Sequence, residues 1–475
     1  MVIKTKIIAT VGPATSDRGV IGELIENGVD VFRLNFSHGS FDDYAALLDE
    51  INAARDNAGR VTAVMGDLCG PKIRSGIIDS DDNILLEGSE ISIVSSSEPG
   101  NAERFGTNYE FFVQDVEVGD RVFIDDGQLA LLAVSKTDDE VVCRVIVGGQ
   151  LNSRKGINLP DTKVSIPSIT PKDWKCVDWA VEHDMDFLAL SFVRSGDDVK
   201  QLKDYLAGKD SKIKVVSKIE TPQAVADLEA VVDASDAVLV ARGDLGVEMD
   251  LAEVPLIQKR ITRMCHQKGK PVIVATQMLQ SMIDMPTATR AEISDVANAI
   301  MDLTDAVMLS GETAVGKYPV EALKTINRVA TYTESYLDSL DESRLTIKAE
   351  SSDRLVATLA PNVAHIVDEI DAPIVATWSQ SGTTAAFFSK ARIDSPIIAY
   401  SSDARVCRQM CMQYGVIPQM EDVPAGIEEF AAIVDKTVLQ TRMARPDDKV
   451  VLVTTRKPGS KDKANVIVVH TVEAD

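Results

Sequence analysis

Eight short runs rich in Val, Ile and Ala recur along the first two-thirds of the chain, and helical patterns separate them. Near-continuous apolar runs are typical of parallel strands buried on both faces, and their alternation with helices is typical of βα units. Periodicity alone does not distinguish a closed (β/α)8 barrel from an open parallel sheet. The runs are residues 6–11, 29–35, 61–68, 186–192, 213–219, 237–241, 272–276 and 306–309.

The polar residues at the ends of these runs favour the barrel. In a (β/α)8 barrel the carboxyl ends of all strands converge on one rim, and active sites lie there. An open sheet would give so many polar strand ends no common centre. The residues are Arg33, Asn35, Asp67, Ser191, Lys218, Glu220, Arg242, Asp244, Thr276, Ser310 and Glu312.

The βα rhythm is interrupted once and then resumes after a linker. Residues from about 71 to 167 alternate in hydrophobicity between Gly and Asp turns, which predicts a small all-β insertion placed to act as a lid. A polar stretch at 341–354 reads as a linker, and strands are expected beyond it near 373–377, 396–400, 449–454 and 466–469.

The 475 residues exceed one ordinary core, so the length predicts two or three domains, and the pattern along the chain favours three. They are a (β/α)8 catalytic barrel at 1–70 and 168–340, an inserted β-barrel lid domain at 71–167, and a C-terminal open α/β regulatory domain at 351–475.

Composition excludes several classes of protein. The formal charge of −24 argues against binding nucleic acid, which requires a basic face. No apolar run is long enough to span a membrane, and the N-terminal residues read as a strand rather than a signal peptide. None of the six cysteines forms a CxxC pair, which favours reduced thiols over a zinc site. We therefore expect a soluble cytoplasmic protein with no nucleic-acid or membrane partner.

A lysine and a carboxylate lie two residues apart where one run ends, in Ser217-Lys-Ile-Glu220. Side chains two apart on a strand point to the same side, and Asp244 is expected on the neighbouring rim loop. Two carboxylates with water and substrate oxygens suit Mg²⁺, and a nearby ammonium can stabilise phosphoryl charge. A structural ion pair between Lys218 and Glu220 would give the same pattern, so these residues alone leave both interpretations open.

Further ordered blocks accompany this segment. They are Val31-Phe-Arg-Leu-Asn-Phe-Ser-His-Gly39, Ala63-Val-Met-Gly-Asp-Leu-Cys-Gly-Pro-Lys-Ile-Arg-Ser-Gly76, Asp125-Asp-Gly127, Arg154-Lys-Gly-Ile-Asn-Leu-Pro160, Ala241-Arg-Gly-Asp-Leu-Gly246, Val274-Ala-Thr-Gln-Met-Leu279 and Met308-Leu-Ser-Gly-Glu-Thr-Ala314. In this order and spacing they resemble the signature blocks of pyruvate kinases. The resemblance runs from Lys4 to about Pro319 and continues more loosely to the C-terminus.

The resemblance implies an enzyme that passes the phosphoryl group of phosphoenolpyruvate to ADP, giving pyruvate and ATP at the last step of glycolysis. Glu220 and Asp244 would bind Mg²⁺ (or Mn²⁺), and Lys218 would neutralise the phosphoryl group in flight. Arg33 would contact the same group, because its planar guanidinium suits phosphate oxygens. The substrate carboxylate would be held by Ala241, Arg242, Gly243, Asp244 and Thr276, and Thr276 would also belong to the proton relay to the enolpyruvate.

The nucleotide site implied by the resemblance is shared between the barrel and the insertion. Arg74 and Lys155 would reach the nucleotide phosphates from the insertion, and Pro13 and His38 would lie near the nucleotide. Ser310 and Glu312 match positions that support the site from behind. The resemblance also implies a homotetramer.

One departure from the family pattern concerns K⁺. Many pyruvate kinases hold K⁺ with residues matching Asn35, Ser37, Asp67 and the carbonyl of Leu68, and carry Thr and Glu where this chain has Leu68 and Lys72. The pair found here resembles members that work without K⁺, in which the lysine ammonium replaces the ion. We expect K⁺-independent activity; the alternative is that Lys72 is merely a solvated surface residue.

Two glycine-containing segments resemble phosphate-binding loops. Gly311-Glu-Thr-Ala-Val-Gly-Lys-Tyr318 matches the P-loop pattern except at its last position, where Tyr replaces the magnesium-binding hydroxyl, so we expect a chance resemblance. Thr377-Trp-Ser-Gln-Ser-Gly-Thr-Thr-Ala385 follows a strand and opens a helix, and a basic loop at 455–463 accompanies it.

Regulated pyruvate kinases bind phosphorylated effectors through a similar Ser/Thr-Gly loop in this domain. We expect a phosphosugar or nucleotide-monophosphate effector held by Ser379, Ser381, Thr383 and Thr384. Simple N-capping of the helix by these hydroxyls is the alternative.

Two other functions fit parts of the pattern. A magnesium-dependent 2-oxo acid lyase of the barrel type would use Glu220, Asp244 and Arg33, but the insertion with Lys155 would then have no purpose. A non-catalytic phosphometabolite sensor would not need the intact Lys218 and both metal carboxylates. The kinase is therefore the function that we expect.

Overall fold

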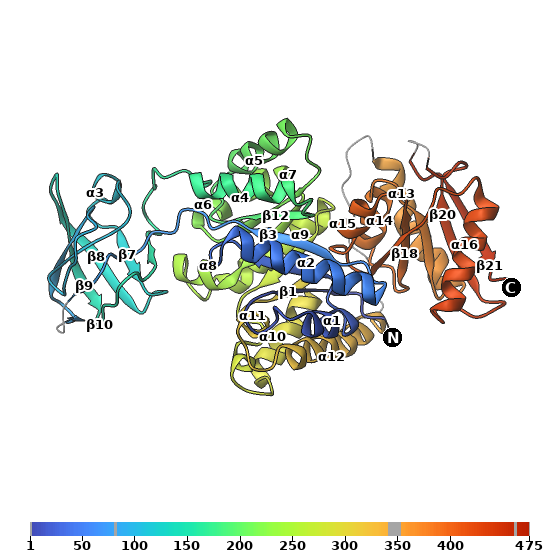
Figure 1. Ribbon diagram of the computed structural model, residues 1–475, viewed down its shortest axis with the longest axis horizontal. Helices are drawn as coiled ribbons and strands as arrows, with labels where there is room; N and C mark the ends of the chain where they lie inside the picture. The colour runs from blue at the N-terminus through green and yellow to red at the C-terminus, as the bar shows by residue number, and fades with distance from the viewer. Residues whose placement is uncertain (1, 80–82, 341–352, 460–462, 475) are drawn as a thin grey trace.

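The computed structural model describes residues 2–79, 83–340, 353–459 and 463–474, arranged as three parts in a row (Figure 1). The insertion and the C-terminal domain lie at opposite ends of a central barrel. Residues 341–352, most of the predicted linker, lie outside the described residues, and so do 460–462 in the basic loop. Within the described ranges no helix is long and apolar enough to cross a membrane.

Eight parallel strands close into a barrel, which confirms the predicted (β/α)8 fold. Around the barrel their order is β1-β16-β15-β14-β13-β12-β3-β2. The strands are β1 (Lys6–Thr10), β2 (Val31–Asn35), β3 (Ala63–Asp67), β12 (Phe187–Leu190), β13 (Lys214–Ile219), β14 (Ala237–Ala241), β15 (Val272–Ala275) and β16 (Ala306–Leu309). Each falls within one of the eight apolar runs, because strands buried on both faces need apolar residues throughout.

Alternation along each strand divides the apolar residues between two cores. On β13, Val216 faces the inside of the barrel, whereas Val215 and Ile219 pack outward under the helices. The same alternation places Lys218 inward, two residues beyond Val216.

The outer layer consists of helices that follow the strands. They are α1 (Arg18–Glu26), α2 (Phe41–Ala58), α4 (Pro171–Glu182), α5 (Gly196–Gly208), α6 (Pro222–Ala226), α7 (Leu228–Ala234), α8 (Arg242–Glu248), α9 (Val254–Gln267), η1 (Gln280–Ile283), α10 (Arg290–Met301), α11 (Gly311–Ala314) and α12 (Pro319–Asp338). Capping boxes begin four of these helices: Ser40 with Asp43, Thr170 with Asp173, Ser195 with Asp198, and Thr289 with Glu292. These reciprocal bonds satisfy N–H groups that a helix start would otherwise leave unpaired.

The insertion has its own apolar core and is built from strands, as predicted. Its elements are β4 (Ile84–Leu85), β5 (Glu90–Val94), β6 (Arg104–Gly106), α3 (Phe112–Asp115), β7 (Arg121–Ile124), β8 (Leu129–Lys136), β9 (Val141–Val147), β10 (Gly149–Gln150) and β11 (Ile157–Asn158). Six strands pair in the order β11-β7-β8-β9-β5-β6, and β10 pairs with β4 separately. Arg74 bridges to Gly156 beside β11, and Ser75 bridges to Thr107 beside β6, so one short segment joins both edges of the six-stranded sheet.

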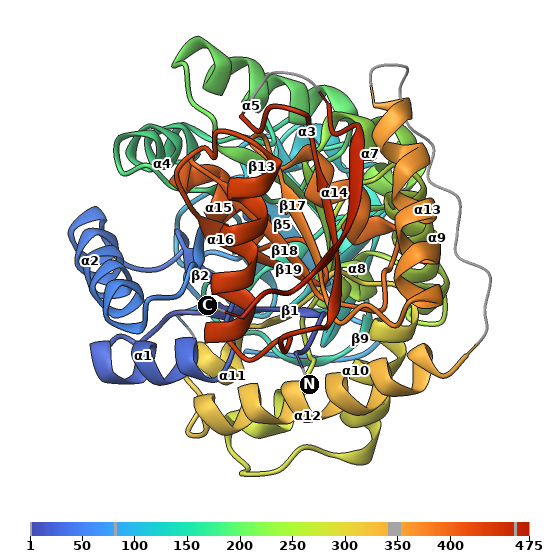
Figure 2. The ribbon, with the colours of Figure 1, turned by 90° about the vertical axis from the view of Figure 1, so that its right-hand side faces the viewer.

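The C-terminal domain is an open five-stranded sheet in the order β19-β18-β17-β20-β21. Its strands are β17 (Val375–Trp378), β18 (Ile397–Ser401), β19 (Val416–Met420), β20 (Lys449–Thr454) and β21 (Val466–Thr471), and its helices are α13 (Arg354–Glu369), α14 (Thr383–Lys390), α15 (Ala404–Met410) and α16 (Ile427–Gln440). The four expected strands are present, and β19 is an additional one. Figure 2 shows this sheet lying across one end of the barrel.

The C-terminal domain closes the amino-terminal end of the barrel. Cys411 and Met412 pack against the inward-facing residues of the barrel strands. Around them, Asp305 accepts bonds from Lys390 and Arg392, and Arg408 reaches Asp186 at 2.6 Å. Asp305 is 0 % exposed and Lys390 only 2 %, so this ion pair crosses the interface without water. The exact domain boundaries predicted from the sequence stay predictions.

The buried pair yields a stability prediction. Asp305→Asn keeps the shape of the side chain but leaves the Lys390 charge buried without its counter-ion, so we expect a loss of about 3–5 kcal/mol in the free energy of unfolding. Urea unfolding followed by circular dichroism measures it. The control is Asp284→Asn, because Asp284 pairs with Lys317 in solvent and its loss should change little. Equal effects of the two substitutions would contradict the prediction.

Candidate active site

The polar strand ends converge on the barrel rim that faces the insertion. Lys218 lies at the centre of the cluster: its Nζ is 2.9 Å from Glu220 Oε1, 2.8 Å from Ser191 Oγ and 3.4 Å from Asp67 Oδ1. Burial alone would lower the pKa of Lys218, but the carboxylates of Asp67 and Glu220 outweigh it and raise the pKa above its ordinary value. The ammonium therefore stays charged at any physiological pH.

Asp67 is the shared counter-ion of two cations. Its Oδ2 accepts a bond from Arg33 Nε at 2.7 Å, while its Oδ1 faces Lys218. Burial raises the pKa of Asp67, but Lys218 and Arg33 together hold it below its ordinary value. The hydroxyl of Thr10 accepts a further bond from Arg33 Nη1 at 3.0 Å. These bonds fix the guanidinium at the rim.

Glu220 and Asp244 fit the predicted magnesium site. Glu220 is 1 % exposed, and its Oε2 accepts the N–H of Phe192 at 2.7 Å. Burial raises the pKa of Glu220, Lys218 opposes this, and the nearby charge of Asp244 raises it further, which means that the two carboxylates repel each other across the site. A divalent cation between them would relieve that repulsion.

Asp244 lies in the first turn of the short helix α8 rather than on a loop. Its carboxylate is half-buried and accepts no hydrogen bond from the residues that the structure describes. Those residues hold no cluster of three or more His, Cys, Asp or Glu side chains suited to a metal. Two carboxylates nevertheless suffice for Mg²⁺, because this ion keeps several water or substrate oxygens.

The residues predicted to hold the substrate carboxylate lie together at the start of α8. Gly243 N–H, expected to face an anion, donates instead to Thr276 Oγ1 at 2.7 Å, and that hydroxyl lies 2.6 Å from the Ala275 carbonyl. Thr276 has φ of +68°, a conformation that β-branched residues rarely adopt. Arg242 holds it there by donating to the Thr276 carbonyl at 2.9 Å. Such local strain is typical of functional sites.

Ser310 and Glu312 support this region from behind, in line with the resemblance. Glu312 is buried, and its two carboxylate oxygens accept the N–H groups of Leu279 at 2.9 Å and Ser310 at 2.8 Å. The carboxylate therefore ties the segment after β15 to the segment after β16.

The structure places the predicted nucleotide residues in two groups. Arg74 and Lys155 are neighbours in the insertion, where Ser75 N–H donates to the Lys155 carbonyl at 2.8 Å. Arg74 Nη1 donates to the Arg154 carbonyl, and Lys155 Nζ pairs with Asp125 at 3.0 Å. Pro13 and His38 are exposed on the barrel rim. Within the described ranges no hydrogen bond or ion pair joins the two groups.

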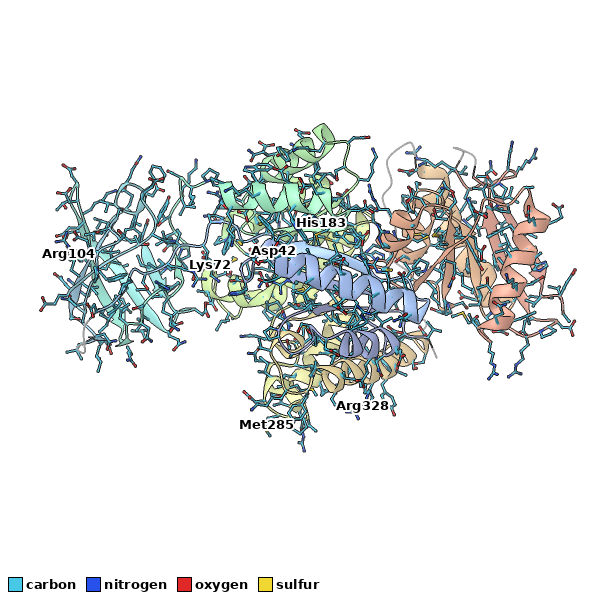
Figure 3. The ribbon with its side chains drawn as sticks, in the orientation of Figure 1. Asp42, Lys72, Arg104, His183, Met285 and Arg328 are labelled. Atoms are coloured by element: carbon cyan, nitrogen blue, oxygen red, sulfur yellow. The ribbon has the colours of Figure 1, made fainter. Side chains whose placement is uncertain are left out.

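The predicted monovalent-cation region lies beside the Lys218 cluster. Asn35 Oδ1 accepts the Ser37 N–H at 3.1 Å, and the Leu68 carbonyl accepts the Ser191 hydroxyl at 2.7 Å. Lys72 lies at the junction of insertion and barrel (Figure 3), and its exposed side chain makes no ion pair with any described residue.

A second lysine approaches the same region. Lys172, at the start of α4, donates to the carbonyl of Phe36 at 3.1 Å, between Asn35 and Ser37. This contact could not be predicted from the sequence, because α4 is far from this loop along the chain.

The loop predicted to hold an effector combines helix capping with hydroxyls that do not cap the helix. Ser379 Oγ accepts the N–H of Ala385 at 3.2 Å, which is capping, but Ser381 and Thr383 bond to each other at 3.0 Å and do not cap α14. Thr384 is buried in the first turn of α14. Beneath the loop, the hydroxyls of Thr377 and Thr454 are buried without a hydrogen-bond partner among the described residues.

The P-loop-like segment has a different structure. Its residues Gly311–Ala314 form the helix α11, and Pro319 occupies the first turn of α12. Lys317 is exposed and pairs with Asp284 at 2.8 Å. The segment therefore has no phosphate-binding loop.

Two family models match the chain. The model described as "Pyruvate kinase, barrel domain" matches residues 2–323, and the model described as "Pyruvate kinase, alpha/beta domain" matches residues 357–470. The chain belongs to the pyruvate kinase family. Pyruvate kinases are phosphotransferases, so the chain is an enzyme of that class, and nothing favours the lyase or the sensor.

Individual pyruvate kinases are similar over the whole length. A pyruvate kinase of Mycobacterium tuberculosis is 39% identical over 479 residues, with 100% of each chain covered. One of Geobacillus stearothermophilus is 38% identical over 99% of this chain and 80% of its own. The crystal structure of a pyruvate kinase from Cryptosporidium parvum superposes with a TM-score of 0.91 at 32% identity, covering 99% of this chain and 96% of that one.

Several contacts at this pyruvate kinase site were not predicted from the sequence. Ser191 was expected on the rim, but its bond to Lys218 was not, and Thr10 was not singled out at all. Glu248 of α8 accepts a bond from Asn158 of the insertion at 2.7 Å. Burial raises the pKa of Glu248 to about 7. These contacts join segments that are distant in sequence, and no motif signals them.

Proposed function

We propose that the chain transfers the phosphoryl group of phosphoenolpyruvate to ADP at the rim cluster of Lys218, Arg33, Glu220 and Asp244. The observation that carries this proposal is the placement of Lys218, whose ammonium lies between two buried carboxylates and beside Arg33. Phosphoryl transfer needs little covalent chemistry from the protein, so fixed positive charge is the main requirement. The lysine and the guanidinium supply that charge without reorganisation during the reaction.

Glu220 and Asp244 would hold the divalent cation, Mg²⁺ or Mn²⁺. When bound, the ion supplies charge neutralisation for the carboxylate and phosphate of phosphoenolpyruvate. The start of α8, from Ala241 to Asp244, would orient the substrate carboxylate together with Thr276. Thr276 also enters the proton relay to the enolpyruvate, for which its hydroxyl must exchange its present bonds for the substrate.

Arg74 and Lys155 would bring positive charge to the nucleotide phosphates as the insertion closes over Pro13 and His38. Closure would exclude water, which otherwise competes with ADP as the acceptor. The support is that both cations already lie next to each other on the insertion, at its junction with the barrel. We further propose a cytoplasmic homotetramer, on the strength of the family alone.

Substitution of Lys218 tests the proposed site of phosphoryl transfer. Lys218→Met removes the charge that faces the phosphoryl group, so we expect turnover to fall on the order of 10²–10³-fold. The assay mixes phosphoenolpyruvate, ADP and Mg²⁺ and measures pyruvate and ATP. Binding of Mn²⁺, measured by electron paramagnetic resonance, should persist because both carboxylates remain. The control is Lys317→Met in the P-loop-like segment, which should keep full turnover; a similar loss in both variants would remove Lys218 from its proposed role.

We also propose that activity does not require K⁺, with Lys72 supplying the positive charge. Two observations support this proposal: the Lys72 side chain is exposed and makes no ion pair with a described residue, and Lys172 adds a second cation at Phe36.

The corresponding prediction uses a buffer free of K⁺ and Na⁺. The unmodified protein should be active there, and added K⁺ should change the rate little. Lys72→Glu should create a requirement for K⁺, because a carboxylate favours a free cation in the cavity. Negligible activity of the unmodified protein that recovers on adding K⁺ would refute the proposal.

We propose an anionic effector, a sugar phosphate or AMP, at the loop of Ser379, Ser381, Thr383 and Thr384. The unpaired buried hydroxyls of Thr377 and Thr454 support a polar ligand there, because buried polar groups seldom lack partners.

A measurement of rate against phosphoenolpyruvate concentration tests this site. We expect a sugar phosphate or AMP to shift the curve, and Ser381→Ala with Thr383→Ala to weaken the shift while leaving the basal rate unchanged. A curve that none of the common sugar phosphates nor AMP moves would exclude the effector.

A further inference from the structure

Residues 192–194 connect β12 to the start of α5 and touch three parts of the site at once. Phe192 has φ of +51°, a left-handed conformation that is unusual for a bulky residue. Such a conformation costs free energy and persists only where the surroundings hold it. The contacts of this segment show what holds it.

One side of the segment faces the candidate metal site. The N–H of Phe192 donates to Glu220 Oε2 at 2.7 Å, and the hydroxyl of Thr221 donates to the Val193 carbonyl at 2.9 Å. The buried carboxylate of Glu220 is thus bonded to the backbone of the segment on one oxygen and to Lys218 on the other. Any movement of this carboxylate toward a cation would therefore change its hydrogen bond with the Phe192 N–H.

The other side of the segment holds the chain that returns from the insertion. Arg194 Nη1 donates to the carbonyl of Val164 at 2.7 Å, Nη2 donates to the carbonyl of Ile166 at 2.5 Å, and Nε donates to Ser168 Oγ at 3.1 Å. Three bonds from one planar group fix both the position and the direction of this connection.

The phenyl ring of Phe192 lies against the outgoing connection. At Gly70, where φ is +65°, an added Cβ would stand 2.8 Å from Phe192 Cδ2, so only glycine allows this approach. The N–H groups of Cys69 and Gly70 are bonded to the buried Asp173 of α4. Both connections of the insertion therefore meet the same three-residue segment.

We propose that residues 192–194 couple occupancy of the metal site at Glu220 to the angle of the insertion, with Arg194 as the positioning residue. The inference rests on the proposed function, because it takes Glu220 as a metal ligand. If Glu220 moved on binding a cation, its bond to the Phe192 N–H would move the segment, and the guanidinium of Arg194 would carry that movement to residues 164–168. By linkage, closure of the insertion over ADP must in turn strengthen binding of metal and phosphoenolpyruvate.

Hydrogen exchange on the whole protein tests the coupling. The probe is Mg²⁺ with phosphoenolpyruvate and no ADP, so that no reaction occurs. In the unmodified protein the ligands should slow exchange at 69–72 and 164–168. In Arg194→Met this slowing should disappear at 164–168, while the slowing at 276–278 beside the substrate remains. The KM for ADP should rise about tenfold, as expected for a typical coupling.

Two further variants keep the test decisive. Arg263→Met alters an exposed arginine of α9 away from the insertion and should behave like the unmodified protein. Arg194→Lys keeps the charge but cannot make three planar bonds, so it should lose part of the slowing even if Arg194→Met folds poorly.

Different results would overturn the proposed function and the coupling. An unmodified protein that makes no pyruvate and ATP would overturn the proposed function. An active protein whose Arg194→Met and Arg194→Lys variants keep the full slowing at 164–168, with the KM for ADP unchanged, would overturn the coupling alone.

Discussion

The charge balance around Asp67 is the interaction on which the site depends. One buried carboxylate holds a guanidinium and an ammonium on the same rim, and without it these two cations would repel each other in a region with little water. Asp67 ends β3, Arg33 reaches it from the adjacent strand β2, and Lys218 reaches it from β13. Two strands thereby place positive charge around the single carboxylate of a third, and the barrel supplies the rigidity that keeps the charges there.

Much of the fold could be predicted from the sequence, because strands buried on both faces leave continuous apolar runs. The strands β14 and β16 begin and end at the same residues as their predicted apolar runs. The strand β12 is shorter than its run, because Asp186, Ser191 and Phe192 lie outside the hydrogen-bonded strand. The strand β19 was missed because its alternating sequence, with Pro418 inside it, does not read as a buried parallel strand. The segment forms a strand because it pairs with β18, and not because of the pattern of its own residues.

Some contacts of the site could likewise be predicted from the sequence, and others could not. Lys218 and Glu220 could be placed together because strand alternation fixes their geometry over two residues. The contacts of Ser191, Thr10 and Lys172 could not be predicted, since each depends on the packing of elements far apart in sequence. At Gly243 the sequence suggested a contact that the structure does not have. A glycine at this position suggested a backbone contact to an anion, but the Gly243 N–H donates to the Thr276 hydroxyl.

The floor of the barrel is made by another domain. Because Cys411 and Met412 fill the amino-terminal opening, the eight strands do not complete their own interior. A fragment ending before the C-terminal sheet would present an apolar mouth ringed by the unneutralised acids Asp186 and Asp305, a surface prone to self-association. Catalysis at one end of the barrel therefore depends on the presence of the C-terminal domain at the other, because that domain covers the apolar strand ends.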